Sequence, residues 1–175
     1  MESAPPALRE ASDARPVLEV EGNKVFSKQE LLDVANTCLD RNTEAGKPFE
    51  TARLDYCLYQ LTDHMRAKGY LQARLGKTLY NQTEGVSKAT IPVEEGPLYR
   101  VGEIKIENTK LFSPAQIQDL IGLRPGDIAD GAKLGTALYE RAKEAYGNFG
   151  YIQYTAEITP TFRVKEGPMR ALQIS

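Results

Sequence analysis

The chain has few of the residues that metal sites and catalytic sites usually need. Its 175 residues include one histidine, two cysteines and no tryptophan. His64, Cys38 and Cys57 supply only three of the ligands that a four-ligand zinc site requires. A catalytic triad could be built only around His64, which lies in a polar helical stretch and is predicted to be at the surface. We therefore expect no catalytic residue, no metal site and no cofactor.

The chain also lacks an excess of one charge and any long apolar run. Lysine and arginine number 22 against 24 aspartates and glutamates, which gives a net charge of -2. This balance provides no basic field, so we expect no nucleic-acid partner. No stretch approaches the roughly 20 apolar residues that cross a bilayer, and Met1–Pro16 lacks the apolar core of a signal peptide. Hydrophobic residues at 41% and charged residues at 26% are typical of a folded protein.

The main positive feature is an internal repeat. Leu18–Ser27 recurs as Ile104–Ser113, and Lys68–Gln72 recurs as Phe149–Gln153. Both pairs keep the same order along the chain, which predicts two homologous domains. The predicted parts are a flexible N-terminal segment at 1–16, a first domain at 17–97 and a second domain at 98–175.

Each copy is predicted to begin with a strand and a helix. Alternating apolar residues at 17–21 and 101–107 are typical of a half-buried strand. Ser27 and Ser113 then stand where a helix N-cap is expected, each with a glutamate or glutamine three residues later as its capping-box partner.

The rest of each copy is predicted to be a second helix and a hairpin. The second helix stops near Gly69 in one copy and near Gly150 in the other, because glycine readily adopts the left-handed conformation that ends helices. The strands of the hairpins are predicted over 70–80 and 86–93, and over 151–160 and 169–174.

These elements define an α+β fold of two tandem β-α-α-β-β domains. Each domain has a three-stranded mixed sheet, and two helices cover one of its faces. A right-handed crossover places the first strand beside the third and parallel to it. The second strand is then an open edge with unpaired backbone groups.

This order resembles that of POTRA (polypeptide-transport-associated) domains, and several motifs support the resemblance. Val93–Val101 runs directly into Gly102–Asn108, a linker that looks most like that of BamA-type assembly factors. Further family-like motifs are Leu111–Ser113, Gly122–Asp127 and the Gly-Tyr pairs at Gly69 and Gly150. The resemblance covers residues 17–175. It departs from the family at Asn108–Thr109, where Glu-Gly-Asn is usual.

The resemblance implies a function in protein transport. POTRA domains form the periplasmic arm of outer-membrane barrel proteins that insert or export other proteins. The implied partners are unfolded outer-membrane polypeptides, accessory assembly proteins and the membrane barrel of a full-length parent. The chain would then be a piece of a longer Gram-negative outer-membrane protein, located in the periplasm. Three alternatives stay open: the arm of a two-partner secretion transporter, a division-type scaffold, and an enzyme with an unrecognised site.

The open edges suggest a binding mechanism. An extended client can add to an exposed strand through main-chain hydrogen bonds, which are indifferent to side-chain sequence. We predict such edges at 70–75 and 151–156. The residues expected to contact the client are Tyr70, Gln72, Arg74, Tyr151, Gln153 and Thr155. The alternative is an edge that is merely solvated.

The two cysteines lie on predicted core stripes of the two helices in the first copy. Cys38 and Cys57 can meet if these helices pack antiparallel, but the distance between their Cα atoms cannot be read from sequence. In an oxidising compartment they form either a disulfide or a pair of buried free thiols.

Overall fold

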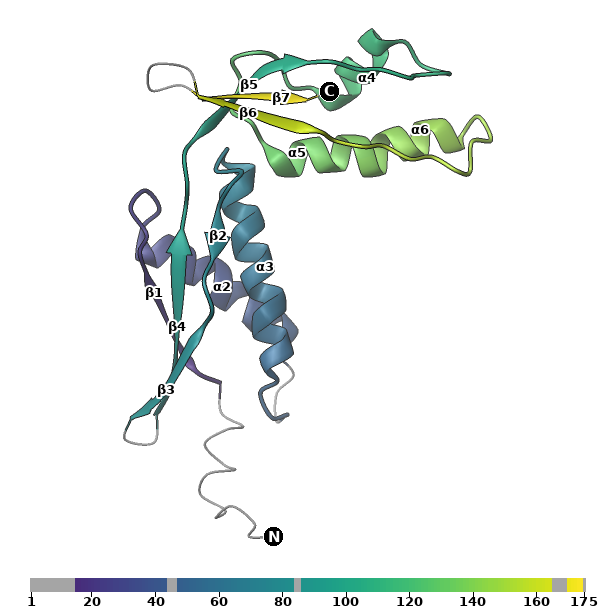
Figure 1. Ribbon diagram of the computed structural model, residues 1–175. Helices are drawn as coiled ribbons and strands as arrows, with labels where there is room; N and C mark the ends of the chain where they lie inside the picture. Colours follow the sequence, from purple (N-terminus) through teal and green to yellow (C-terminus); the bar gives the residue numbers. More distant parts are fainter. Residues whose placement is uncertain (1–14, 44–46, 84–85, 165–169, 175) are drawn as a thin grey trace, which may run out of the picture. The chain divides into compact units, whose positions relative to one another are not determined.

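The computed structural model describes residues 15–43, 47–83, 86–164 and 170–174. They form two compact units, each of which combines helices with a mixed sheet (Figure 1). Unit 1 comprises Met1–His64 and Ala73–Glu95, and unit 2 comprises Met65–Gln72 and Gly96–Ser175. The predicted α+β class with two tandem repeats is confirmed. The predicted segment 1–16 lies almost wholly outside the described residues.

The sheet of unit 1 is built around one long central strand. Strand β4 (Val86–Glu94) pairs in parallel with β1 (Val17–Glu21). On its other side β4 pairs antiparallel with β2 (Arg74–Leu75) and with β3 (Leu79–Thr83). Buried and exposed residues alternate along β1 and through most of β4, so one face of the sheet packs on the core. This is the predicted mixed sheet, in which the first strand is parallel to the third.

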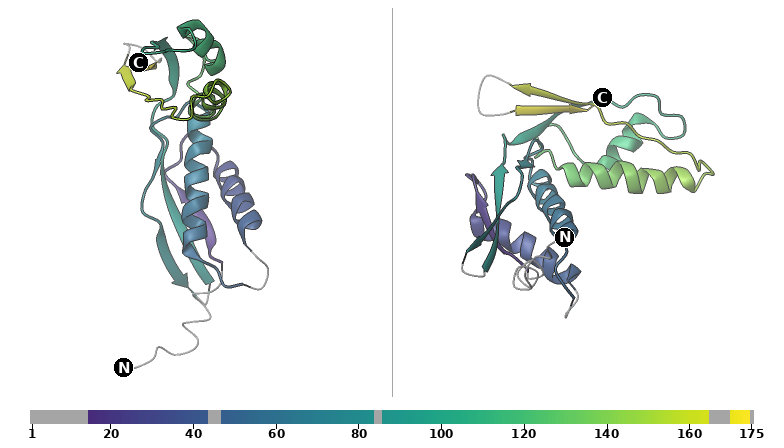
Figure 2. Two further views of the ribbon diagram at one scale, coloured as in Figure 1. Left: turned by 90° about the vertical axis from the view of Figure 1, so that its right-hand side faces the viewer. Right: turned by 60° about the horizontal axis from the view of Figure 1, so that its bottom comes forward.

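Two helices cover one face of this sheet (Figure 2). They are α2 (Lys28–Asn42) and α3 (Thr51–Ala67). Helix α2 begins at the predicted cap, Ser27, whose hydroxyl accepts a hydrogen bond from the amide of Glu30. The apolar faces of the helices meet the inner face of β4, and Leu31, Leu54 and Ile91 are fully buried there.

Unit 2 repeats this topology with a shorter sheet. Its central strand, β7 (Arg170–Ile174), pairs in parallel with β5 (Tyr99–Ile104) and antiparallel with β6 (Pro160–Val164). The backbone of Ile174 lies opposite Ile104 on one side and opposite Pro160 on the other. The pairing of all three strands therefore ends at the same level.

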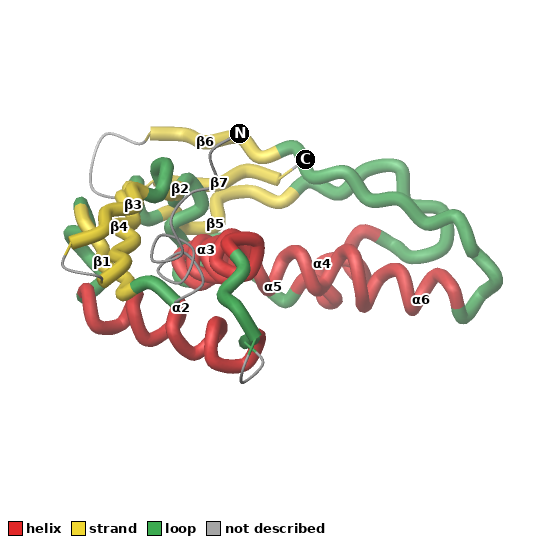
Figure 3. Tube along the Cα trace, turned by 90° about the horizontal axis from the view of Figure 1, so that it is seen from below, coloured by secondary structure: helices red, strands yellow, loops and turns green. Residues whose placement is uncertain are grey.

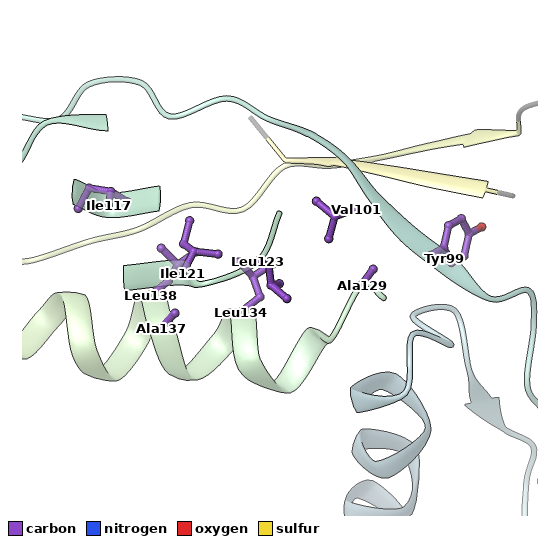
Figure 4. Packing of buried hydrophobic residues seen from close by; sticks show 9 residues of the cluster. All are labelled: Tyr99, Val101, Ile117, Ile121, Leu123, Ala129, Leu134, Ala137 and Leu138. Atoms are coloured by element: carbon purple, nitrogen blue, oxygen red, sulfur yellow. The ribbon is translucent and has the colours of Figure 1, made fainter. Parts of the chain in front are cut away.

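The helices of unit 2 pack against one side of its sheet. They are α4 (Pro114–Ile121) and one continuous helix made of α5 (Gly131–Thr136), η1 (Ala137–Ala142) and α6 (Lys143–Gly147). Ser113 and Gln116 form the predicted capping box, and Gly122 ends α4 with a left-handed φ of 64°. The core that these elements enclose (Figure 4) consists of Tyr99, Val101, Ile117, Ile121, Leu123, Ala129, Leu134, Ala137 and Leu138.

The strand predicted at 70–80 is wrong over its first part. After α3 the amides of Lys68 and Tyr70 both donate to the carbonyl of Met65, and Gly69 has a left-handed φ of 91°. This C-cap makes the chain turn before it enters the sheet. The ladder therefore begins only at Arg74.

The strand predicted at 151–160 is also wrong over most of its length. The described chain forms no ladder there before Pro160. Pro160 pairs with Ile174, the last described residue, so residues 151–159 have no described strand opposite them. The first strand of this copy, predicted at 101–107, likewise ends at Ile104 because its pairing with β7 ends there. The predicted third strands agree with β4 and β7 within one residue.

Candidate functional site

The open edge of unit 1 is a broken strand formed by β2 and β3. The ladder between this edge and β4 is interrupted at Pro92, which has no N–H to donate. The carbonyl of Pro92 accepts a hydrogen bond from the amide of Gly76 at 2.8 Å. Because the N–H and C=O of a strand residue point to the same side, the missing donor also faces β2 and β3. The break in the edge therefore follows from a proline in the central strand.

Strand β3 exposes its side chains along an open backbone edge. All five of its residues are exposed, and no described strand pairs with its outer side. Leu79 is 56% exposed and Tyr80 is 51% exposed. Tyr80 lies opposite the fully buried Ala89, so its ring is on the helix-covered face. Partial burial is the main cause that raises the pKa of Tyr80. The negative charge of Asp55 on α3 raises it further.

Arg74 is held by its neighbour across the ladder. Its Nε donates to Oε2 of Glu94 at 2.6 Å, and its Nη2 donates to Oε1 at 2.8 Å. The two residues lie opposite each other, so this bidentate pair joins β2 to β4. The hydrogen bond from Arg74 is the main cause that holds the pKa of Glu94 below its ordinary value. Arg74, one of the residues predicted to contact a client, is therefore already bound to a carboxylate.

Acidification is expected to release the Arg74–Glu94 pair. Because the pKa of Glu94 is lowered from 4.5, the pair stabilises the fold above pH 4.5, and this contribution is lost as the pH falls through the folded-state value. Both side chains are exposed, so the effect is local and small. The measurement is a titration of side-chain Nε–H signals by NMR. The signal of Arg74 should move below pH 4.5, whereas that of Arg100, whose guanidinium binds the carbonyl of Gly126, should not. An Arg74 signal that stays unchanged down to pH 2 would contradict this.

The other predicted site residues do not share a strand. Tyr70 is half-buried and Gln72 is exposed in the turn that follows α3. Tyr151, Gln153 and Thr155 are exposed on the extended segment that precedes β6. The structure brings neither set into a ladder, and their role in binding clients stays a prediction.

Strand β3 is the edge that sequence reasoning misses. Alternating apolar residues from Leu71 to Leu79 favour one continuous strand that starts soon after Gly69 and stops near Tyr80. The residue from which the break between β2 and β3 could have been predicted is Pro92, in the following strand. A proline in a central strand removes a ladder hydrogen bond and so predicts an irregularity in the strand opposite.

Unit 2 contains a groove of about 510 Å³ between two extended segments. One wall is formed by residues 104–109, which continue β5, and the other by residues 154–157 and Thr159. The floor is mostly apolar and consists of Ile117, Ile121, Leu138 and Tyr146. We refer to this feature as the unit 2 groove. Of the six predicted contact residues, Thr155 lines it.

Two contacts fix elements beside the sheet of unit 1. Cys38 on α2 and Cys57 on α3 form a disulfide with their Cα atoms 5.6 Å apart, one of the two states that the sequence left open. At the end of β4, the carboxylate of Glu95 is 5% exposed and accepts hydrogen bonds from the consecutive amides of 24–26 at 2.9–3.0 Å. The first contact joins the two helices, and the second holds the loop after β1 against β4.

The described residues offer little to a metal ion. Among them, no group of three or more His, Cys, Asp or Glu side chains could hold one. His64, on α3, is paired instead with Glu30 on α2, with 2.9 Å between Nε2 and Oε1. In the same part of the chain, no helix is long and apolar enough to cross a membrane.

Two mixed sheets in tandem, each covered by helices, have the architecture of a modular repeat protein. The POTRA family model, described as "Surface antigen variable number repeat", matches residues 18–96 and 99–170. The chain therefore belongs to the POTRA family, as its resemblance predicted.

Curated and solved relatives agree with this assignment. A Treponema pallidum (strain Nichols) protein named as an outer membrane protein assembly factor is 26% identical over 162 residues, which cover 84% of this chain and 19% of that protein. This chain therefore spans about a fifth of its relative's length. POTRA domains 3–5 of BamA from Haemophilus influenzae match with a TM-score of 0.62 at 10% identity, covering 91% of this chain and 59% of that one. BamA from Haemophilus ducreyi lacking POTRA domains 1–3 matches with a TM-score of 0.62 at 15% identity, covering 91% and 29%. At these identities the two structures show a shared fold.

Proposed function

We propose that the chain is the periplasmic arm of a Gram-negative outer-membrane protein assembly machine and binds extended polypeptides by strand addition. Its family and the name of its Treponema relative support the assembly role. Its partners are unfolded outer-membrane polypeptides, accessory assembly proteins and a membrane barrel. Its role is binding rather than catalysis.

The observation that carries this proposal is the open edge of β3. The strand pairs with β4 on one side, and all five of its side chains are exposed. An extended client can therefore pair with Leu79–Thr83 through main-chain groups whatever its own sequence. Each hydrogen bond contributes about 1 kcal/mol net, so a short pairing is weak and reversible. Weak binding suits a client that must be handed on.

Exposed tyrosine rings lie on β3 and on α3, the helix that carries Asp55. Tyr80 is at the edge of the helix-covered face, near Asp55 of α3. The same helix exposes Tyr56 and Tyr59, by 52% and 60%. Tyrosine provides a large contact area at low entropic cost and tolerates many partners. The edge therefore offers sequence-independent pairing together with a preference for apolar side chains.

Strand addition at β3 is expected to depend on every second backbone N–H of the client, namely those that face β3. A seven-residue peptide of alternating valine and threonine, titrated into the ¹⁵N-labelled chain, should shift the amides of Leu79–Thr83. In a paired strand, alternate N–H groups face the sheet. N-methylation of that set should weaken binding at least tenfold, whereas N-methylation of the other set should leave it nearly unchanged. NMR titration with the three peptides measures both effects.

The predicted contact residues are followed in the same titration. Shifts confined to 70–75 and 151–156 would move the site to the segments named from sequence. Equal binding of both N-methylated peptides would show side-chain adsorption and refute strand addition. The matched chain variant is Leu79→Lys, which places a charge on the exposed edge and should weaken binding.

A further inference from the structure

Two exposed tyrosines and one exposed carboxylate belong to β3 and to the helix α3 that covers one face of its sheet. Tyr80 of β3 points to the helix-covered face, because it lies opposite Ala89, which is fully buried. On α3, Tyr59 is 60% exposed and Asp55 is exposed as well. The position of these two residues on the helix decides whether a strand added to β3 would meet them.

The Cys38–Cys57 disulfide shows which side of α3 faces away from α2. The bond joins the two helices, so the side of α3 that carries Cys57 faces α2. Two residues turn an α-helix by about 200°. Asp55 and Tyr59 each stand two residues from Cys57, so both lie on the side of α3 away from α2. They are four residues apart, a spacing that makes them neighbours on the helix surface.

This side of α3 lies toward the open edge of the sheet. Helix α2 packs beside β1, at one side of β4, whereas α3 lies toward β2 and β3, at the other side (Figure 3). Partial burial, and after it the negative charge of Asp55, raises the pKa of the Tyr80 hydroxyl, in agreement with a carboxylate close to this ring. A strand added to β3 therefore passes beside both Tyr80 and Asp55.

The negative charge beside Tyr80 is not balanced by a cation. Within the described part of the chain, no lysine or arginine forms an ion pair with Asp55. The other face of the sheet differs. There Lys88 lies opposite Asn81, and its Nζ donates to Oε1 of Glu19 at 2.8 Å. An unpaired carboxylate thus stands on the helix-covered face, and an ion pair that is already complete stands on the other.

A carboxylate beside aromatic rings selects for a cation. A guanidinium or ammonium group is attracted by the rings and by the carboxylate at once. Its aliphatic stem packs on a ring while the charged head reaches outward. Arginine suits this place better than lysine, because its planar group stacks on rings and donates two parallel hydrogen bonds to a carboxylate. A glutamate at the same place would be repelled by Asp55.

We propose that the β3 edge selects client strands that carry arginine at the position opposite Tyr80. The guanidinium lies on the helix-covered face, contacts the rings of Tyr80 and Tyr59, and pairs with the carboxylate of Asp55. The arginine also sets the register of the client, because a shift by one residue turns its side chain to the other face. This selection rests on the strand addition proposed above: main-chain pairing holds the client, and Asp55 discriminates among clients.

The test uses the ¹⁵N-labelled 175-residue chain and three peptides. Each is the seven-residue valine–threonine peptide with its central residue replaced by arginine, by citrulline, which is a neutral analogue of arginine, or by glutamate. All three should shift the amides of Leu79–Thr83. The arginine peptide should bind about threefold or more tightly than the citrulline peptide, as an exposed ion pair and a cation–π contact together imply. The glutamate peptide should bind most weakly, and high ionic strength should reduce these differences.

Substitutions at Asp55 identify the group responsible. Asp55→Asn should at least halve the advantage of arginine over citrulline, because only the rings then attract the cation. Asp55→Lys should reverse the order, so that the glutamate peptide binds best. Asp55 is exposed, so neither variant removes a buried contact. Asp33→Asn is the matched control: it removes an exposed carboxylate from α2 and should leave the order and the ratios unchanged.

The possible failures are distinguishable. If the three peptides shift the amides of Leu79–Thr83 with equal affinity, strand addition stands and the selection of a cation is refuted. An advantage of arginine that persists in Asp55→Lys would refute the role of Asp55. If no peptide shifts these amides, the function proposed for the β3 edge is itself wrong, and cation selection falls with it.

Discussion

Removal of the Cys38–Cys57 disulfide is expected to lower the free energy of unfolding of unit 1 by about 3 kcal/mol. The bond joins positions 19 residues apart and fixes α2 against α3. A cross-link of this span restricts the unfolded chain, and its loss restores that chain entropy. The variant is C38A/C57A, because alanine leaves no unpaired polar group at the fully buried position of Cys57.

Amide exchange separates the two units in this experiment. Exchange at Ile91, in the core of unit 1, should speed up by about two orders of magnitude in C38A/C57A, which is the factor that 3 kcal/mol implies. Exchange at Ile121, in the core of unit 2, is the internal control and should stay unchanged. Reductant should reproduce the effect in the native chain and have none in the variant. Equal acceleration in both units would show that the bond stabilises more than unit 1.

The sequence predicts the fold well where its signals are local. Ser27 and Ser113 are recognisable caps because the residue three positions later completes the pattern, and the structure places helix starts at both. The repeat then predicts the same topology twice. The mixed sheet follows from the direction of successive elements and requires no knowledge of side-chain contacts.

The sequence predicts the structure of a segment poorly where that structure depends on residues of the strand opposite. Strand β3 is separated from β2 because of Pro92 on another strand, which the local sequence of 74–83 does not show. Glu94 and Glu95 illustrate the same limit. The first is an exposed partner of Arg74 and the second is a buried acceptor, yet their local sequence does not distinguish them.

Replacement of Glu95 by alanine is expected to destabilise unit 1 by about 2–4 kcal/mol, because it removes a buried carboxylate that accepts hydrogen bonds from three consecutive amides, and hydrogen bonds to charged groups are strong. The carboxylate accepts from the amides of Lys24 and Val25 at 3.0 Å and from that of Phe26 at 2.9 Å. The amide of Phe26 is buried with its side chain, which is 5% exposed. Urea unfolding, followed through the amides of unit 1, measures the change.

Two further substitutions at this position and beside it sharpen the test. Glu95→Gln keeps one oxygen acceptor but turns an NH₂ group toward amide donors, so it should cost about half as much as alanine. Glu94→Gln is the matched control: it removes an adjacent carboxylate that is exposed and bound only to Arg74, so unfolding should be almost unchanged. If Glu94→Gln were as damaging as Glu95→Ala, general charge near the end of β4, rather than the three amide contacts, would account for the stability. If only the Glu95 variants unfold early, the loop after β1 is held in place by this one carboxylate.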